Sequence, residues 1–141
     1  MSDKPRWSEK YRFGIAEIDR QHQQLFAIFW ELHTAIGEGS DLEKVNDCFD
    51  RLHRYVMTHF AYEEQLMTEY DFPQLLAHRQ QHADIRDDLQ ALLSIYNETE
   101  ESEVKLGIPH KVAEFLEEWL EEHIHHSDRQ YALHLLDRGV S

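Results

Sequence analysis

Apolar residues recur along this chain at intervals of three and four positions, the spacing that places side chains on one face of an α-helix. Four segments carry this pattern, over residues 18–36, 45–66, 75–96 and 112–123. The apolar–polar alternation of a half-buried strand is not found. Four helices of this length with short connections predict an all-α fold, an up-down-up-down four-helix bundle.

Residues with special backbone preferences mark the expected helix ends. Ser40, with Glu43 three positions later, forms a capping box for the second helix. Pro73 suits the first turn of the third helix. The acidic stretch 97–105 has too little apolar content to pack, so we expect a loop there and a fourth helix that begins after Pro109.

Two further segments flank the bundle. The N-terminal arm contains Trp7, Tyr11 and Phe13, which we expect to pack across the helices. The C-terminal tail has a helical pattern and closes at Gly139. The chain length fits one domain, residues 1–141, divided into an arm (1–17), a bundle (18–127) and a tail with a short C-terminal helix (128–141).

Composition narrows the classes of partner. Lysine and arginine number 14 against 28 acidic residues, and the net charge of −14 argues against binding to nucleic acid or to an anionic membrane. No apolar run is long enough to insert into a bilayer, and the polar start of the chain shows no signal-peptide core. The single cysteine, Cys48, forms no internal disulfide, so a cytoplasmic location and a half-buried packing role are expected.

Seven side chains of the types that bind metals fall on the apolar positions of these helices. Four steps of about 100° return a side chain to within roughly 40° of its starting direction, so residues four apart point the same way. His59 with Glu63 and His78 with His82 are two such pairs. Buried imidazoles and carboxylates are costly unless a partner compensates, and a metal centre would do so. The full set is His22, His59, Glu63, His78, His82, His123 and Asp128.

Seven protein ligands are too many for one metal ion, because zinc sites take four ligands and octahedral sites six. Two octahedral ions bridged by both carboxylates and one solvent-derived oxygen would keep one position open for a small ligand. An imidazole-rich set with some carboxylate suits iron, although cobalt, copper and zinc accept such groups. Fewer anionic ligands stabilise high-valent iron less well, which favours binding oxygen over activating it.

Buried histidines also occur without a metal. A lone histidine on an apolar face is usually a hydrogen-bonded core residue, but five interior histidines strain that interpretation. His33 is interpreted as a buried or bundle-end polar group and His53 as exposed. In a regular helix His126 lies about 60° from His123, whereas Asp128 lies about 140° away. Spacing alone therefore leaves open which of the two is the ligand.

Four stretches of the chain form a recognisable set. They are Ile18-Asp19-x-Gln21-His22-x-x-Leu25, His59-Phe60-x-x-Glu63-Glu64-x-x-Met67, His78-x-x-x-His82 and Trp119-Leu120-x-x-His123-Ile124-x-x-x-Asp128. With these stretches in this order across nearly its whole length, the chain resembles the hemerythrin family, and more closely the single-domain bacteriohemerythrins.

This resemblance implies a function and a role for each ligand. It implies a protein that binds dioxygen reversibly for transport, storage or delivery rather than an enzyme, with its open position on the two-histidine iron. It also favours Asp128 over His126, and Asp128 then requires the fourth helix to distort or end near Ser127. The implied set is one iron on His78, His82 and His123, a second on His22 and His59, and bridges from Glu63, Asp128 and an oxo or hydroxo group. The residues that match the family's oxygen pocket are Leu25, Phe60, Trp119, Leu120 and Ile124.

Several functional alternatives use the same residues. Asp19, Glu64 and Tyr62 are candidates to orient the ligand histidines. The same site could serve a di-iron enzyme or a sensor of oxygen, peroxide or nitric oxide, and a buried proton donor near the open position would favour the enzyme. An iron store and a metal-free acidic interaction module are further alternatives. The resemblance suggests a monomer, with an oxygen-consuming enzyme as a candidate recipient.

Overall fold

The computed structural model describes residues 6–37 and 42–141, and for 102–104 and 125–127 the backbone alone. Within these ranges the chain is helical and contains no strand. A short 3₁₀ helix, η1 (Glu9–Tyr11), precedes the bundle, and a π-helix, η2 (Trp119–Asp128), lies near its C-terminal end. The α-helices are α1 (Ala16–Gly37), α2 (Leu42–Glu69), α3 (Leu75–Glu98), α4 (Ser102–Glu118) and α5 (Arg129–Asp137).

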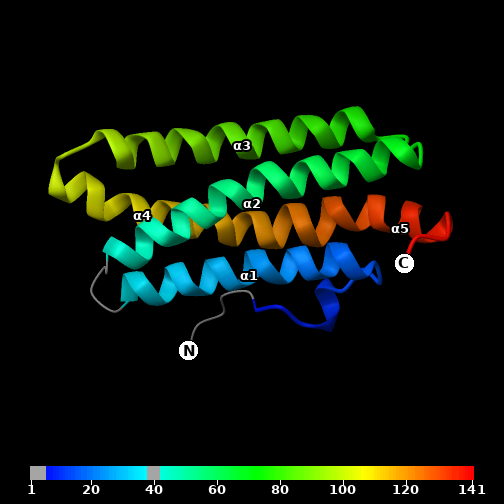
Figure 1. The fold of residues 1–141 in the computed structure, drawn as a ribbon, viewed down its shortest axis with the longest axis horizontal. Helices are drawn as coiled ribbons and strands as arrows, with labels where there is room; N and C mark the ends of the chain where they lie inside the picture. Colours follow the sequence, from blue (N-terminus) through cyan, green and yellow to red (C-terminus); the bar gives the residue numbers. More distant parts are fainter. Residues whose placement is uncertain (1–5, 38–41) are drawn as a thin grey trace.

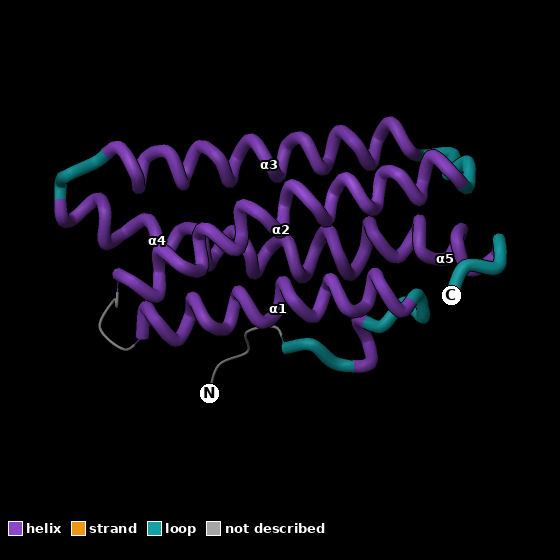
Figure 2. Tube along the Cα trace, in the orientation of Figure 1, coloured by secondary structure: helices purple, strands orange, loops and turns teal. Residues whose placement is uncertain are grey.

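Figure 1 shows α1 to α4 running alternately in opposite directions along the long axis of the molecule. Contacts join α1 to α2, α2 to α3, α3 to α4 and α4 back to α1, so the four helices close into a bundle. η2 and α5 continue directly from α4, as the unbroken helical tube in Figure 2 shows. The predicted all-α, up-down-up-down bundle with a short C-terminal helix is therefore confirmed.

The apolar stripes predicted from the sequence meet along the bundle axis. Leu25 and Leu32 of α1 and Leu52 of α2 have no exposed surface. Burying a side chain of this size stabilises the fold by about 1.5–3 kcal/mol. His53 points away from this core and is exposed, as expected. Across the described part of the chain, no helix is both long enough and apolar enough to cross a membrane.

The N-terminal arm packs against the outside of α1, as predicted. Tyr11 and Phe13 are buried, and Trp7 is partly buried against the core. The Asp19 carboxylate fixes the turn into α1 by accepting the backbone N–H of Phe13 at 2.8 Å and of Gly14 at 3.1 Å. The arm is thereby held over the half of α1 that also carries the ligand candidate of that helix.

The fourth helix begins earlier than the sequence suggests. The composition predicts a loop over 97–105 and a helix after Pro109, but α4 starts at Ser102 and passes through that proline. Ile108 and Val112 are buried and extend the apolar stripe back by a turn. Their burial outweighs the one backbone hydrogen bond that proline cannot make. The acidic stretch is thus largely helical, and the connection shrinks to 99–101.

Two further residues, Pro73 and Ser40, are predicted to mark the starts of helices. Pro73 is expected in the first turn of the third helix, but it lies in the turn before α3. The N–H of Leu75 donates to the Phe72 carbonyl at 3.2 Å, and His78 makes the first helical bond, to Gln74 at 3.0 Å. Phe72 is buried, so it anchors this turn and delays the helix. The predicted capping residue Ser40 lies outside the described residues.

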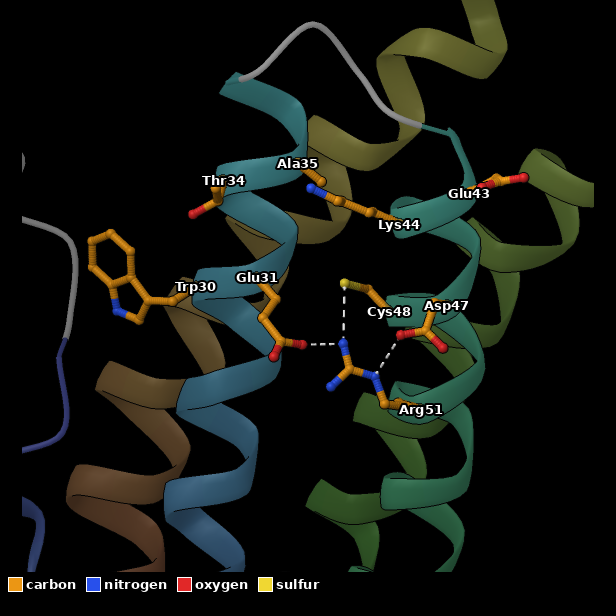
Figure 3. Close-up of a pocket in the computed structure, with 9 residues that line it drawn as sticks. All are labelled: Trp30, Glu31, Thr34, Ala35, Glu43, Lys44, Asp47, Cys48 and Arg51. Atoms are coloured by element: carbon orange, nitrogen blue, oxygen red, sulfur yellow. Dashed lines mark hydrogen bonds and ion pairs between the residues drawn. The ribbon is translucent and has the colours of Figure 1, made fainter.

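Near the N-terminal end of α2, Cys48 lies beside an ion pair that joins α2 to α1. Figure 3 shows the Arg51 guanidinium between Glu31 of α1 and Asp47, with the Cys48 sulfur beside it. The Sγ of Cys48 lies 3.6 Å from Arg51 Nη2, and the thiol is buried. Burial raises the pKa of this thiol, so little of the reactive thiolate forms at neutral pH. The packing role expected for Cys48 fits these contacts.

Candidate metal centre

The seven ligand candidates come from every helix of the bundle and meet in its interior. Each sits where its helix presents an apolar position to the core, which is why residues far apart in sequence converge. All seven are buried, and the most exposed, His123, shows 7% of its surface. They are His22 on α1, His59 and Glu63 on α2, His78 and His82 on α3, and His123 and Asp128 in η2.

The Glu63 carboxylate faces histidines from three helices. Its Oε1 lies 3.1 Å from Nε2 of His82 and 3.2 Å from Nε2 of His59, and its Oε2 lies 3.6 Å from Nε2 of His22. The i,i+4 spacing of His59 and Glu63 produces the contact within α2, as the helical period predicts. Glu63 thus stands at the meeting point of α1, α2 and α3.

The Asp128 carboxylate occupies the equivalent position toward the fourth helix. Its Oδ1 lies 2.9 Å from Nε2 of His78 and 3.0 Å from Nε2 of His123, and its Oδ2 lies 3.4 Å from Nε2 of His22. A π-helix forms i→i+5 hydrogen bonds, so its wider turn brings Asp128 onto the same face as His123. The expected distortion of the fourth helix is confirmed. The side chain of His126 lies outside the described part of the chain.

The donor atoms form two overlapping groups, each small enough to surround a metal ion. The atoms within each group lie within 4.8 Å of one another. Both carboxylates belong to both groups, whereas each histidine belongs to only one. One group is Glu63, His78, His82, His123 and Asp128, and the other is His22, His59, Glu63 and Asp128.

Unsatisfied polar atoms test whether these residues suit a metal. Thirteen buried side-chain nitrogen and oxygen atoms lack a hydrogen-bond partner in the described part of the chain, and nine of them belong to these seven residues. Every histidine of the set contributes its Nε2, the atom turned toward the carboxylates. A buried polar atom without a partner is costly, and coordination would remove that cost. The donor set therefore fits one or more metal ions.

The charges of the metal-free site depend on the same contacts. Burial disfavours the carboxylate form of Glu63, but His59, His22 and His82 outweigh burial and hold its pKa well below the usual range. Burial also disfavours protonated His22, yet Asp128 and Glu63 raise its pKa to about 9. The pKa of His59 is lowered, chiefly by burial. His22 is thus protonated at neutral pH in the metal-free site, and a metal ion that bound there would have to displace this proton.

Hydrogen bonds from outside the set orient two of the histidines. Nδ1 of His82 lies 2.9 Å from Oε2 of Glu64, which confirms the prediction that Glu64 orients a ligand histidine. The other oxygen of Glu64 accepts from Nε of Arg79 at 3.1 Å, which fixes the carboxylate in turn. Nδ1 of His59 lies 2.6 Å from Oε1 of Gln21, a partner that the sequence did not identify. Such bonds leave Nε2 as the metal-facing atom in both histidines.

Two expected orienting residues do not have that role. Asp19 accepts two backbone amides of the N-terminal arm instead of a histidine N–H. Asp19 lies in the first turn of α1, so its carboxylate can reach back to backbone amides of the turn that precedes the helix. Tyr62 is only partly buried and has no hydrogen bond to a ligand candidate within the described residues.

Tyr131, three residues beyond Asp128 in α5, is a partner of the site that the sequence did not identify. Its ring has no exposed surface, and its hydroxyl donates a hydrogen bond to Oε2 of Glu63. The ring centroid of Tyr131 lies 5.1 Å from that of His78. Burial raises the pKa of Tyr131 well above 10, so it remains a donor at ordinary pH. The residue falls in the predicted tail, and only its apolar-stripe position could have signalled a role.

The five residues expected to form an oxygen pocket are all buried, with at most 4% of their surface exposed. Phe60 stacks on His82, with ring centroids 3.9 Å apart and planes 3° apart, and lies 5.4 Å from the ring of Trp119. An aromatic wall therefore covers one face of the donor cluster. The pocket assignment of Leu25, Phe60, Trp119, Leu120 and Ile124 stays a prediction.

Comparison with known proteins agrees with this geometry. The hemerythrin HHE cation binding domain matches residues 14–134. A bacteriohemerythrin of Stenotrophomonas maltophilia is 30% identical over 89% of this chain and 78% of its own length. A bacteriohemerythrin of Ralstonia nicotianae is 30% identical over 94% and 90%, and one of Clostridium acetobutylicum is 26% identical over 89% and 96%. The domain match covers most of the chain, including all seven ligand candidates, and the chain therefore belongs to the hemerythrin family.

Proposed function

We propose that this protein binds dioxygen reversibly at a non-haem di-iron centre, for oxygen transport, storage or delivery. The observation that carries the proposal is the sharing of Glu63 and Asp128 between the two donor groups. Two carboxylates that each face both groups suit two bridged ions, whereas a single ion would leave several buried donors without a partner. Two iron ions would supply the pair of electrons that reversible dioxygen binding uses.

The ligand assignment follows the two donor groups. We assign His78, His82 and His123 to one iron and His22 and His59 to the other, with Glu63 and Asp128 as bridges. The two-histidine side has fewer protein donors, so it is the side left with room for dioxygen. Gln21 and Glu64 hold two of the histidines in the orientation that this assignment needs.

The surrounding residues favour binding over turnover. Phe60 and Trp119 form an apolar wall on one side of the cluster, and exclusion of water and protons on that side would protect a reactive bound ligand. Tyr131 is a buried hydroxyl near the donors, but it is engaged with Glu63 and its pKa is raised well above 10. It is therefore a poor proton source for a reductive reaction, and a carrier fits better than a di-iron enzyme.

Visible absorption of the iron-loaded protein tests the proposal. The protein is reduced without air, exposed to oxygen and then degassed, and we expect an absorption band that forms and is lost reversibly. Metal analysis should give two irons per chain. A band that never forms, or that decays at once while added reductant is consumed, would refute reversible binding and favour the enzyme or an iron store.

Two substitutions separate the roles within the site. Glu63→Ala should abolish stable iron binding, because it removes a donor common to both groups. Phe60→Ala should retain iron but shorten the lifetime of the oxygenated form, since it opens the wall beside His82. Phe49→Ala is the control, because Phe49 is a buried phenylalanine that packs on Tyr96 rather than on a ligand candidate.

A further inference from the structure

A groove of about 450 Å³ lies between α3 and the segment formed by α4 and η2. It opens on the surface, and its lining includes Trp119 and His123 of η2, of which His123 belongs to the donor cluster. This groove is separate from the charged contact around Cys48, which lies between α1 and α2. The residues of the groove that matter here are Asp84, Asp88, Glu118, Glu122, Trp119 and His123.

The mouth of the groove is negatively charged. Two aspartates of α3 face two glutamates of the opposite wall, all four are exposed, and no lysine or arginine lines the groove. Asp84 accepts a hydrogen bond from Gln80 at 3.0 Å. For Asp88, Glu118 and Glu122 no ion pair or hydrogen bond is found with other described residues. Carboxylates without a competing cation in the groove give its mouth a negative potential, which attracts a divalent metal ion from solution.

The inner wall of the groove reaches the donor cluster itself. His123 lines the groove and is 7% exposed, whereas the other six ligand candidates are 3% exposed or less. Its Nε2, 3.0 Å from Oδ1 of Asp128, has no hydrogen-bond partner among the described residues. Trp119 stands beside it, and its buried Nε1 is likewise unpartnered within the described ranges. His123 is therefore the ligand candidate that lines the groove, while its buried Nε2 faces Asp128 inside the donor cluster.

We propose that this groove is the route by which divalent iron reaches the centre. The carboxylates attract the hydrated ion to the mouth of the groove, and the ion passes beside His123 into the donor cluster. A cleft lined by one sign of charge raises association rates by about 10–10³. Exposed carboxylates act at long range, so the effect falls as salt screens them. This inference rests on the proposed metal centre, but it concerns how fast the centre fills rather than what it binds.

Metal uptake by the metal-free protein tests the route. Cobalt(II) is the probe, because its absorption reports coordination in a stopped-flow experiment. The test variant carries Asp88→Asn, Glu118→Gln and Glu122→Gln. The control carries Asp87→Asn, Glu114→Gln and Glu121→Gln, which remove the same charge from exposed positions of the same helices outside the groove.

We expect the groove variant to take up cobalt at least about tenfold more slowly at low ionic strength, with unchanged final stoichiometry and a smaller difference at high salt. The control should fill at nearly the rate of the parent protein. Equal rates for the two variants would overturn the route, as would a lower final stoichiometry reached at an unchanged rate. A groove that instead received a positively charged electron-donor protein would leave cobalt uptake unaffected. Failure of the metal centre itself is distinguishable, because the parent protein would then bind no cobalt.

Discussion

The hydrogen bond from Tyr131 to Glu63 allows a quantitative test of the centre's architecture without any metal. Tyr131→Phe removes one oxygen atom and leaves the ring packed beside His78. The hydroxyl is fully buried, so no water replaces it, and its acceptor is a carboxylate whose pKa is held well below the usual range. Hydrogen bonds to charged groups contribute about 1.5–3 kcal/mol, and we expect the free energy of unfolding to fall by that amount.

Tyr55→Phe is the matched control. Tyr55 is a buried tyrosine stacked on His59, with ring centroids 4.8 Å apart, but its hydroxyl has no hydrogen-bond partner in the described part of the chain. An unsatisfied buried hydroxyl costs about 1–3 kcal/mol, so its removal should leave stability unchanged or raise it by about 1 kcal/mol. The same atomic change is thus expected to destabilise the protein at Tyr131 and to leave its stability unchanged or higher at Tyr55.

The assay is urea unfolding of the metal-free variants, followed by circular dichroism. With a denaturant dependence of about 2 kcal/mol per molar, a loss of about 2 kcal/mol lowers the midpoint by about 1 M. Parallel slopes are required, because a changed slope would indicate an altered unfolded or folded ensemble. If Tyr131→Phe and Tyr55→Phe shift the midpoint equally, the hydroxyl of Tyr131 does not support Glu63 and the reasoning is refuted.

Three further predictions concern binding and the arm. Metal affinity should rise about tenfold per pH unit up to about pH 9, because below its pKa of about 9 His22 holds a proton that the metal must displace. A metal affinity that does not change with pH in a chelator competition would contradict this prediction. Glu64→Ala should weaken metal binding about 10–100-fold, because the ring of His82 loses the hydrogen bond that orients it. Glu69→Ala is the control at an exposed position, and equal metal affinities of the two variants would exclude an orienting role for Glu64. Asp19→Ala should cost about 1.5–3 kcal/mol or more and speed amide exchange in the N-terminal arm, and unchanged exchange would show that the arm is held by other contacts.

The periodicity of the sequence is enough to predict the bundle and most of the donor cluster. His59 with Glu63 and His78 with His82 meet as a 3.6-residue helix requires, because α2 and α3 are regular where they carry these residues. Asp128 is different, since regular geometry turns it away from His123. Family resemblance, rather than the helical period, identifies it.

What the sequence could not predict depends on how the helices are rotated against one another. Gln21 meets His59 across the contact of α1 with α2, and Tyr131 meets Glu63 from the segment that follows η2. No local spacing encodes either pair. The helix start predicted from Pro109 is wrong for the opposite reason. Proline usually ends a helix, but burial of the apolar residues around Pro109 keeps α4 continuous through it.

The π-helix explains how four helices can bring two overlapping donor groups together. A regular helix places ligands four residues apart along one stripe, which serves one side of a site well, as α3 does with His78 and His82. The fourth helix has a different task, because His123 stands with the α3 histidines while Asp128 must also reach His22 on α1. Widening the turn over Trp119–Asp128 directs both side chains inward from one helix. The π-helix is a rare geometry that is frequent at functional sites. Here it lies over the segment in which a regular helix would turn Asp128, a carboxylate common to both donor groups, away from the cluster.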